Sequence, residues 1–160
     1  MGSANLFYYI REGVLEGTVN GEPVRISTYS GGGSGYDPAN PRSVRYTRDT
    51  EAANNPYRTR QLTNEALNTR GGPIPPGRYS IKKPDSESKN VSLEPLNPIG
   101  FFRKTGRTGG FLIHGAGPKG SDGCLVPAST TEFKDLMDKL KSSDGGTLWV
   151  LESVEGDMFG

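Results

Sequence analysis

The sequence predicts a mainly β protein with long loops and one well-defined α-helix in its C-terminal half. Glycine makes up 23 of the 160 residues, about twice the usual ~7%, and 12 prolines add further turn-forming positions. Several short segments alternate apolar and polar side chains, as half-buried strands do. Only one segment combines helical spacing of apolar residues with a clear N-terminal cap. These features favour short strands and long loops over a helical bundle.

The N-terminal segment is predicted to be a β-meander. Strands are expected over 6–10, 14–19 and 24–29, where aromatic and β-branched residues are frequent or alternate with polar ones. Asn20-Gly21 separates the second strand from the third and is a preferred pair for a two-residue hairpin turn.

The middle of the chain gives weaker signals. Segment 71–77 is expected to be a rigid turn, because its prolines have no N–H to donate to a sheet ladder. A strand should follow in which Tyr79 and Ile81 point inward. The remaining expectations are a short helix over 59–68, a polar loop over 84–98, and strands over 99–103, 111–113 and 147–151.

The predicted helix follows Ser129. Ser129 and Glu132 form a capping box, and Phe133, Leu136, Met137 and Leu140 then repeat with the spacing of one apolar helix face. The helix should end at 144–146, where two glycines follow an aspartate. Its apolar face is expected to pack on the sheet, with Met137 in the core.

Length and charge limit the classes of function. A chain of 160 residues suits one domain, 1–160, with a substantial core. The net charge of +1 argues against a duplex nucleic-acid binder. No apolar run is long enough to span a bilayer, and the N-terminus lacks the pattern of a signal peptide. We therefore expect synthesis in the cytoplasm without a leader, and a monomer.

The only histidine and the only cysteine lie ten positions apart in one glycine-rich segment. His114 follows the apolar run 111–113, and Gly123 precedes Cys124 where it would permit a tight turn. A thiol becomes a good nucleophile when a base removes its proton, so this pair is the smallest set of side chains that acyl transfer needs. The amides of Gly123 and Cys124 are candidate donors to an oxyanion.

Other interpretations of the pair remain open. A free cysteine is commonly just a buried apolar residue, and a lone histidine is often structural. A zinc site is disfavoured, because structural sites use four Cys or His ligands and catalytic sites three protein ligands. No metal or other cofactor is therefore expected.

The motif I-H-G, a loop, and then S-x-G-C resembles the active-site signature of the L,D-transpeptidases of bacterial cell walls. A second segment, P-I-P-P-G-R-Y-S-I over 73–81, resembles the T-P-x-G-x-[YF]-x-I segment of that family. The resemblance covers about residues 71–127 and implies the sheet-like or sandwich-like fold of the L,D-transpeptidases. It implies that Cys124 is the nucleophile, that His114 is its base and that the Gly115 carbonyl orients the imidazole. It also implies that Ser121 and Gly123 shape the turn.

Two positions depart from the wider family. Asp122 stands where a second histidine is usual, and Leu125 and Val126 stand where an arginine that holds a substrate carboxylate is usual. Other side chains would then have to contact the substrate. The candidates for substrate contact are Asp122, Tyr79, Arg103, Arg107 and Arg45.

Segment 30–57 is a long loop that begins with a flexible glycine tract. Its simplest interpretation is a solvated surface loop. The alternatives are a lid over the Cys–His cleft, whose arginines, Arg45 among them, meet stem-peptide carboxylates, or a basic arm for nucleic acid.

The compact motif spacing most resembles L,D-transpeptidase-like effectors that type VI secretion exports into rival bacteria. That resemblance implies action in the periplasm of a target cell on peptidoglycan tetrapeptide stems. It also implies contact with a secretion apparatus and with a cognate immunity protein. The expected activity is L,D-carboxypeptidase action, D-amino-acid exchange by L,D-transpeptidation, or both. The alternatives are a cysteine peptidase or amidase that cuts another wall bond, a non-catalytic wall-binding module, and a cytoplasmic protein with an incidental cysteine.

Overall fold

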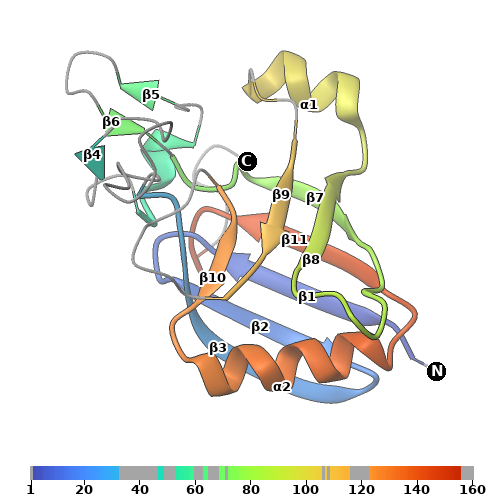
Figure 1. Cartoon of the computed structure of the whole chain (residues 1–160). Coiled ribbons are helices and arrows are strands. Elements are labelled where there is room, and N and C mark those ends of the chain that lie inside the picture. Colours follow the sequence, from blue (N-terminus) through green and yellow to red (C-terminus); the bar gives the residue numbers. More distant parts are fainter. Residues whose placement is uncertain are drawn as a thin grey trace.

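A computed structural model describes residues 2–32, 47–48, 53–59, 63–64, 69–70, 72–105, 107, 109–115 and 123–155. Eight strands form a closed barrel: β1 (Ala4–Tyr9), β2 (Val14–Val19), β3 (Glu22–Ser30), β7 (Gly77–Ile81), β8 (Val91–Pro95), β9 (Phe111–Ile113), β10 (Leu125–Pro127) and β11 (Gly146–Leu151). Their order around the barrel is β1-β11-β7-β8-β9-β10-β3-β2 (Figure 1). The mainly β class is confirmed, and the sheet closes on itself instead of remaining open or forming a sandwich.

The N-terminal meander has the predicted pairing. β1 pairs antiparallel with β2, and β2 pairs antiparallel with β3. Asn20 and Gly21 join β2 to β3 with φ angles of 54° and 78°, the left-handed conformation that a two-residue hairpin turn of this type requires. This local turn therefore sets the register of β2 against β3.

The C-terminal strand closes the barrel against the N-terminal one. β11 lies between β1, to which it is parallel, and β7, to which it is antiparallel. Side chains alternate along the strands, and the apolar residues that point inward form a single cluster in the interior. Leu6, Tyr79, Phe111 and Leu148 are among its buried members. Burial of this cluster is the main source of the barrel's stability.

Helix α2 (Thr130–Lys141) begins after the predicted N-cap residue, Ser129. The Ser129 side chain accepts a hydrogen bond of 3.2 Å from the backbone N–H of Glu132. Leu136, Met137 and Leu140 are buried and join the core cluster, as the apolar spacing predicts. Figure 1 places this helix along the lower side of the barrel, where it crosses part of β3.

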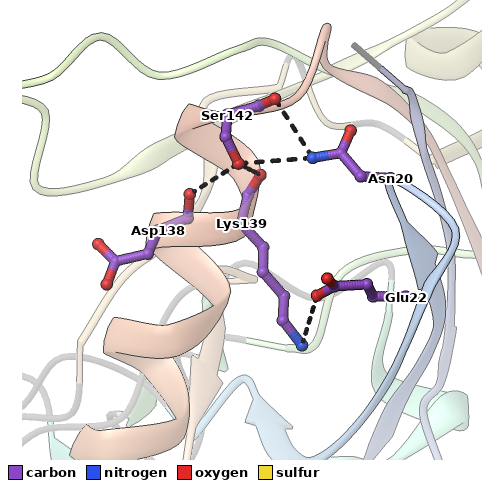
Figure 2. Close-up of polar contacts among 5 residues, drawn as sticks. All are labelled: Asn20, Glu22, Asp138, Lys139 and Ser142. Atoms are coloured by element: carbon purple, nitrogen blue, oxygen red, sulfur yellow. Dashed lines mark hydrogen bonds and ion pairs between the residues drawn. The ribbon is translucent and has the colours of Figure 1, made fainter.

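The C-terminal end of α2 is tied to the turn between β2 and β3 (Figure 2). Asn20 Nδ2 donates to the backbone oxygen of Ser142 at 3.2 Å, and Lys139 Nζ lies 3.9 Å from a carboxylate oxygen of Glu22. The Lys139 side chain therefore points toward the β2–β3 side of the helix.

Two predictions for the middle of the chain are wrong. Residues 99–103 belong not to a strand but to helix α1 (Pro98–Thr105), at the opposite side of the barrel from α2 (Figure 1). Asn97 starts this helix: its side chain accepts from the Gly100 N–H at 3.1 Å, with Pro98 in the first helical position. The predicted loop over 84–98 contains strand β8, in which Val91 and Leu93 are buried.

Short elements lie outside the barrel. They are the 3₁₀-helix η1 (Pro56–Arg58) and a three-stranded sheet of β4 (Thr47–Arg48), β5 (Thr63–Asn64) and β6 (Thr69–Arg70). The predicted helix over 59–68 is wrong at 63–64, which form a strand paired antiparallel with β6. The other residues of that segment, apart from Thr59, are outside the described part of the chain.

Most of the predicted 30–57 loop, including Arg45, also lies outside the described residues. Its end at Asn54 is fixed to the barrel. The Asn54 side-chain oxygen accepts from the Tyr8 hydroxyl at 2.5 Å and from the Ser30 N–H at 2.9 Å. In the parts of the chain that the structure describes, neither helix has the length and apolar character needed to cross a membrane.

Replacing the cap residue of α2 tests how the helix is held. Ser129→Ala removes the acceptor for the Glu132 N–H and should lower the free energy of unfolding by about 1 kcal/mol. Thr131→Ala, at an exposed position of the same first turn, is the matched control and should change it by less than about 0.5 kcal/mol. Urea denaturation measures both values. Equal effects for the two variants would contradict the capping role.

Candidate active site

His114 lies at the C-terminal end of β9. Its ring Nδ1 is 2.9 Å from the carbonyl oxygen of Gly115, the contact expected from the sequence. A carbonyl oxygen can only accept, so this hydrogen bond requires a proton on Nδ1, and in the neutral ring the lone pair is then on Nε2. The ring is therefore held in the tautomer that a general base needs.

Cys124 lies at the N-terminal end of β10, which pairs in parallel with β9. In the register of this pair, Leu125 is opposite Ile113, and the backbone N–H of His114 donates to the carbonyl oxygen of Leu125 at 3.0 Å. Leu125 and Ile113 are fully buried and face the barrel interior. Because successive side chains of a strand alternate, the residues that flank this pair, His114 after Ile113 and Cys124 before Leu125, are expected on the opposite face of the sheet. Both are partly buried.

Gly123 fills a position that no other residue could occupy without strain. Its φ angle is +116°, and a Cβ there would lie 2.6 Å from both Arg107 Nη2 and Phe111 Cε1. The backbone just before Cys124 therefore packs directly on two buried side chains. This contact fixes where β10, and with it the thiol, begins.

Arg107 is buried below this turn, with 7% of its surface exposed. Its Nη1 donates to the carbonyl oxygens of Thr59 at 3.0 Å and Pro73 at 2.8 Å. The guanidinium also lies 5.0 Å above the Phe111 ring centroid. One cation thus joins the segment before β7, strand β9 and the turn that carries Cys124.

Tyr79 belongs to the core. The residue is fully buried, its ring packs edge-on against Phe101 and Phe111, and its hydroxyl donates to the Pro75 carbonyl oxygen at 2.6 Å. Burial raises the pKa of the Tyr79 hydroxyl above its ordinary value, and the positive charge of Arg107 opposes this only in part. Tyr79 therefore supports the proline-rich turn and, at this position, has no exposed surface for a substrate.

Arg103, another candidate for substrate contact, is not at this site. Arg103 is exposed on α1, on the side of the barrel opposite α2 (Figure 1). Ser121, Asp122 and Arg45 lie outside the described residues. His114, Gly115, Gly123, Cys124 and the buried Arg107 are therefore the predicted residues that the structure brings to one region.

A groove of about 480 Å³ borders the His114 end of this region. It lies between α2, the turn before β8 and Gly115. Phe133 and Met137 contribute apolar surface to the groove. Gly115 lies close to Phe133, since a Cβ on Gly115 would be 3.4 Å from the Phe133 ring. The groove therefore adjoins the glycine whose carbonyl holds the imidazole.

The sequence analysis did not predict this groove. Phe133 and Met137 were assigned to the apolar face of the helix, and nothing in the sequence placed that face beside Gly115. Lys89 and Lys134 carried no signal beyond their charge. The pairing of these residues across α2 and the β8 turn is a tertiary feature.

Neither a scan against models of known protein families nor a search of curated proteins gives a match for this chain. Among the described residues, no group of three or more His, Cys, Asp and Glu side chains comes together as a metal site would need. What these residues can supply is a thiol, an imidazole with a free Nε2, and backbone amides at a tight turn. Those are the components of nucleophilic acyl transfer.

Removing the buried cation tests its structural role. Arg107→Met leaves the carbonyls of Thr59 and Pro73 without these donors and should lower the free energy of unfolding by about 3 kcal/mol. Arg103→Met, which removes an exposed arginine from α1, should change it by less than about 0.5 kcal/mol. Both values come from urea denaturation. A similar small effect for both variants would show that Arg107 does not organise the turn.

Proposed function

We propose that this protein catalyses cysteine-dependent acyl transfer on peptidoglycan stem peptides. It acts as an L,D-carboxypeptidase, as an L,D-transpeptidase that exchanges the terminal D-amino acid, or as both. The observation that carries the proposal is the placement of His114 and Cys124 at the ends of paired strands, on the same face of the sheet. The resemblance of I-H-G, S-x-G-C and P-P-G-x-Y to the L,D-transpeptidases supplies the substrate class.

The first half-reaction releases D-alanine. His114 Nε2 takes the proton of the Cys124 thiol, and the sulfur attacks the carbonyl carbon that joins the diamino acid to the terminal D-alanine. The amides of Gly123 and Cys124 donate to the oxyanion. The C–N bond breaks, the proton on His114 passes to the leaving amine, and a thioester to Cys124 remains.

The second half-reaction releases the stem. Water or an amine attacks the thioester carbonyl, His114 Nε2 accepts its proton, and the C–S bond breaks. The proton returns to the sulfur. Water yields a tripeptide stem, and an amine yields an exchanged or cross-linked stem.

The biological setting follows from the resemblance to compact type VI secretion effectors. In that setting the protein is an antibacterial toxin that acts in the periplasm of a target cell. Either outcome of the second half-reaction consumes the tetrapeptide stems that the target uses to build its wall. The producing cell then requires a cognate immunity protein.

Purified tetrapeptide muropeptides test the proposal. Wild-type protein should release D-alanine, and Cys124→Ala should release none, because no other residue in the sequence can form the thioester. His114→Gln should lower the rate by about 10²-fold to 10⁴-fold, the usual contribution of a general base. Mass spectrometry of the muropeptides gives the bond that is cut.

Folding of each variant is checked by its thermal unfolding curve, because a misfolded variant would also be inactive. Absence of D-alanine release by the wild-type protein would overturn the proposal. Cleavage of a different wall bond would assign the protein to the cysteine peptidases or amidases instead.

A further inference from the structure

Exposed apolar side chains gather at helix α1. Three of the six exposed large apolar side chains in the described part of the chain lie between positions 96 and 102. Leu96 precedes the helix, and Ile99 and Phe102 belong to it; their exposed fractions are 49%, 70% and 53%. Single exposed apolar residues are ordinary on a protein surface, but a cluster marks a surface that contacts something else.

Phe101 determines which way the helix faces. Its ring meets the rings of Tyr79 and Phe111 edge-on, with 5.8 Å between centroids in both pairs. Ile99 and Phe102 are three positions apart and are therefore neighbours on the helix surface. Figure 1 shows α1 standing out from one end of the barrel, on the side opposite α2. The core contact of Phe101 thus holds the two exposed side chains outward on a projecting element.

The cations beside these side chains come from two elements. Arg103 and Lys104 are exposed on α1. Arg78 is exposed on β7, where its backbone carbonyl oxygen accepts from the N–H of Leu96 at 3.1 Å. The Arg78 guanidinium lies 4.6 Å from the ring centroid of Trp149, so it stays on the outer face of the barrel. Positive charge therefore borders the apolar cluster at both of its ends.

Acidic side chains do not balance these cations locally. The sequence contains no Asp or Glu from 95 to 121. Glu94 comes just before this stretch, and its carboxylate is paired with Lys82 Nζ at 3.0 Å. Among the residues that the structure describes, no ion pair is found for the two cations of α1. The basic-apolar surface is defined by Arg78, Leu96, Ile99, Phe102, Arg103 and Lys104.

A bilayer with anionic lipids is complementary to this surface in both respects. Aliphatic and aromatic side chains enter the boundary between headgroups and acyl chains, while Lys and Arg remain at the level of the lipid phosphates. Negative headgroups attract the cations, and the attraction falls off within a Debye length. A bilayer also adapts to a projecting helix, whereas a rigid protein partner would need a matching hollow.

We propose that the basic-apolar surface binds the protein peripherally to membranes that contain anionic phospholipids. Ile99 and Phe102 enter the headgroup boundary, and Arg103 and Lys104 contact lipid phosphates. The protein lies on the membrane and does not cross it. This binding makes and breaks no covalent bond, so it does not depend on the proposed acyl transfer and can be tested without it.

Sedimentation with lipid vesicles tests the proposal. Wild-type protein should bind vesicles of equal parts phosphatidylglycerol and phosphatidylcholine at least about tenfold more tightly than pure phosphatidylcholine vesicles. Arg103→Gln/Lys104→Gln should lower the partition coefficient for the anionic vesicles about 25-fold, or about fivefold for each cation. Ile99→Ser/Phe102→Ser should lower it at least about tenfold, because the apolar contact is lost. Thermal unfolding curves check that these exposed substitutions leave the fold intact.

Lys134→Gln/Lys139→Gln is the matched control. It removes the same charge from α2, on the other side of the barrel (Figure 1). This variant should change the partition coefficient by less than about twofold, since its charges lie beyond a Debye length from a membrane at α1.

A fluorescence measurement identifies the face that contacts the lipid. Trp149 is the only tryptophan in the sequence, so Trp149→Phe/Phe102→Trp places a single indole on α1. On anionic vesicles its emission should shift to shorter wavelength, and lipids with brominated acyl chains should quench it. Vesicle binding without either change would assign the contact to another face.

Three further results would overturn the proposal. One is an equal loss of binding in the α2 control, and another is unchanged binding after the loss of Ile99 and Phe102. The third is a wild-type protein that does not sediment with anionic vesicles, which would leave an acidic protein as the partner for this surface. None of these results bears on D-alanine release, so failure of the membrane proposal and failure of the proposed function are distinguishable.

Discussion

The parallel pairing of β9 with β10 is the constraint on which the candidate active site depends. Ile113 and Leu125 face each other across this pair and are both buried, and the His114 N–H donates to the Leu125 carbonyl oxygen. The two interior side chains fix the register, because a shift of β10 by one residue would turn Leu125 away from the interior. With the register fixed, the residues just after β9 and just before β10 must share the outer face. Burial of two aliphatic side chains thus positions an imidazole and a thiol.

A second layer of contacts holds the turn that leads into β10. Arg107 donates to two carbonyl oxygens from different segments, stacks on Phe111 and packs against Gly123. A buried guanidinium is tolerated only where its donors are satisfied. The chain around Arg107 is therefore held in place, because moving either segment that supplies a carbonyl oxygen would separate the buried charge from an acceptor. Arg107 therefore holds in place the backbone before Cys124 and strand β9, which His114 follows.

Local signals in the sequence were enough for several elements. The Asn20-Gly21 turn, the N-cap at Ser129 and the alternation along β3 each depend on neighbours in the chain, and each is observed in the structure. Helix α1 was missed because its apolar run, 99–102, also suits a strand, and the Asn-Pro start at 97–98 was not recognised. Strand β8 was missed because only Val91 and Leu93 of its residues are buried.

The candidate active site could be predicted only in part, because local sequence signals connect residues within one motif but not residues on distant segments. His114, Gly115, Gly123 and Cys124 stand in one motif, so the sequence could connect them. The burial of Tyr79, the inward position of Arg107 and the groove between α2 and the β8 turn depend on how distant segments pack. No local pattern distinguishes a buried arginine such as Arg107 from an exposed one such as Arg103.

The central claim is that the imidazole of His114 activates the thiol of Cys124. The rate of alkylation of this single cysteine by iodoacetamide at pH 7 measures that activation without any assumption about the substrate. We expect native wild-type protein to react faster than the same protein unfolded in urea, and His114→Gln to lose that advantage. Equal alkylation rates for native wild-type and native His114→Gln protein would contradict the account.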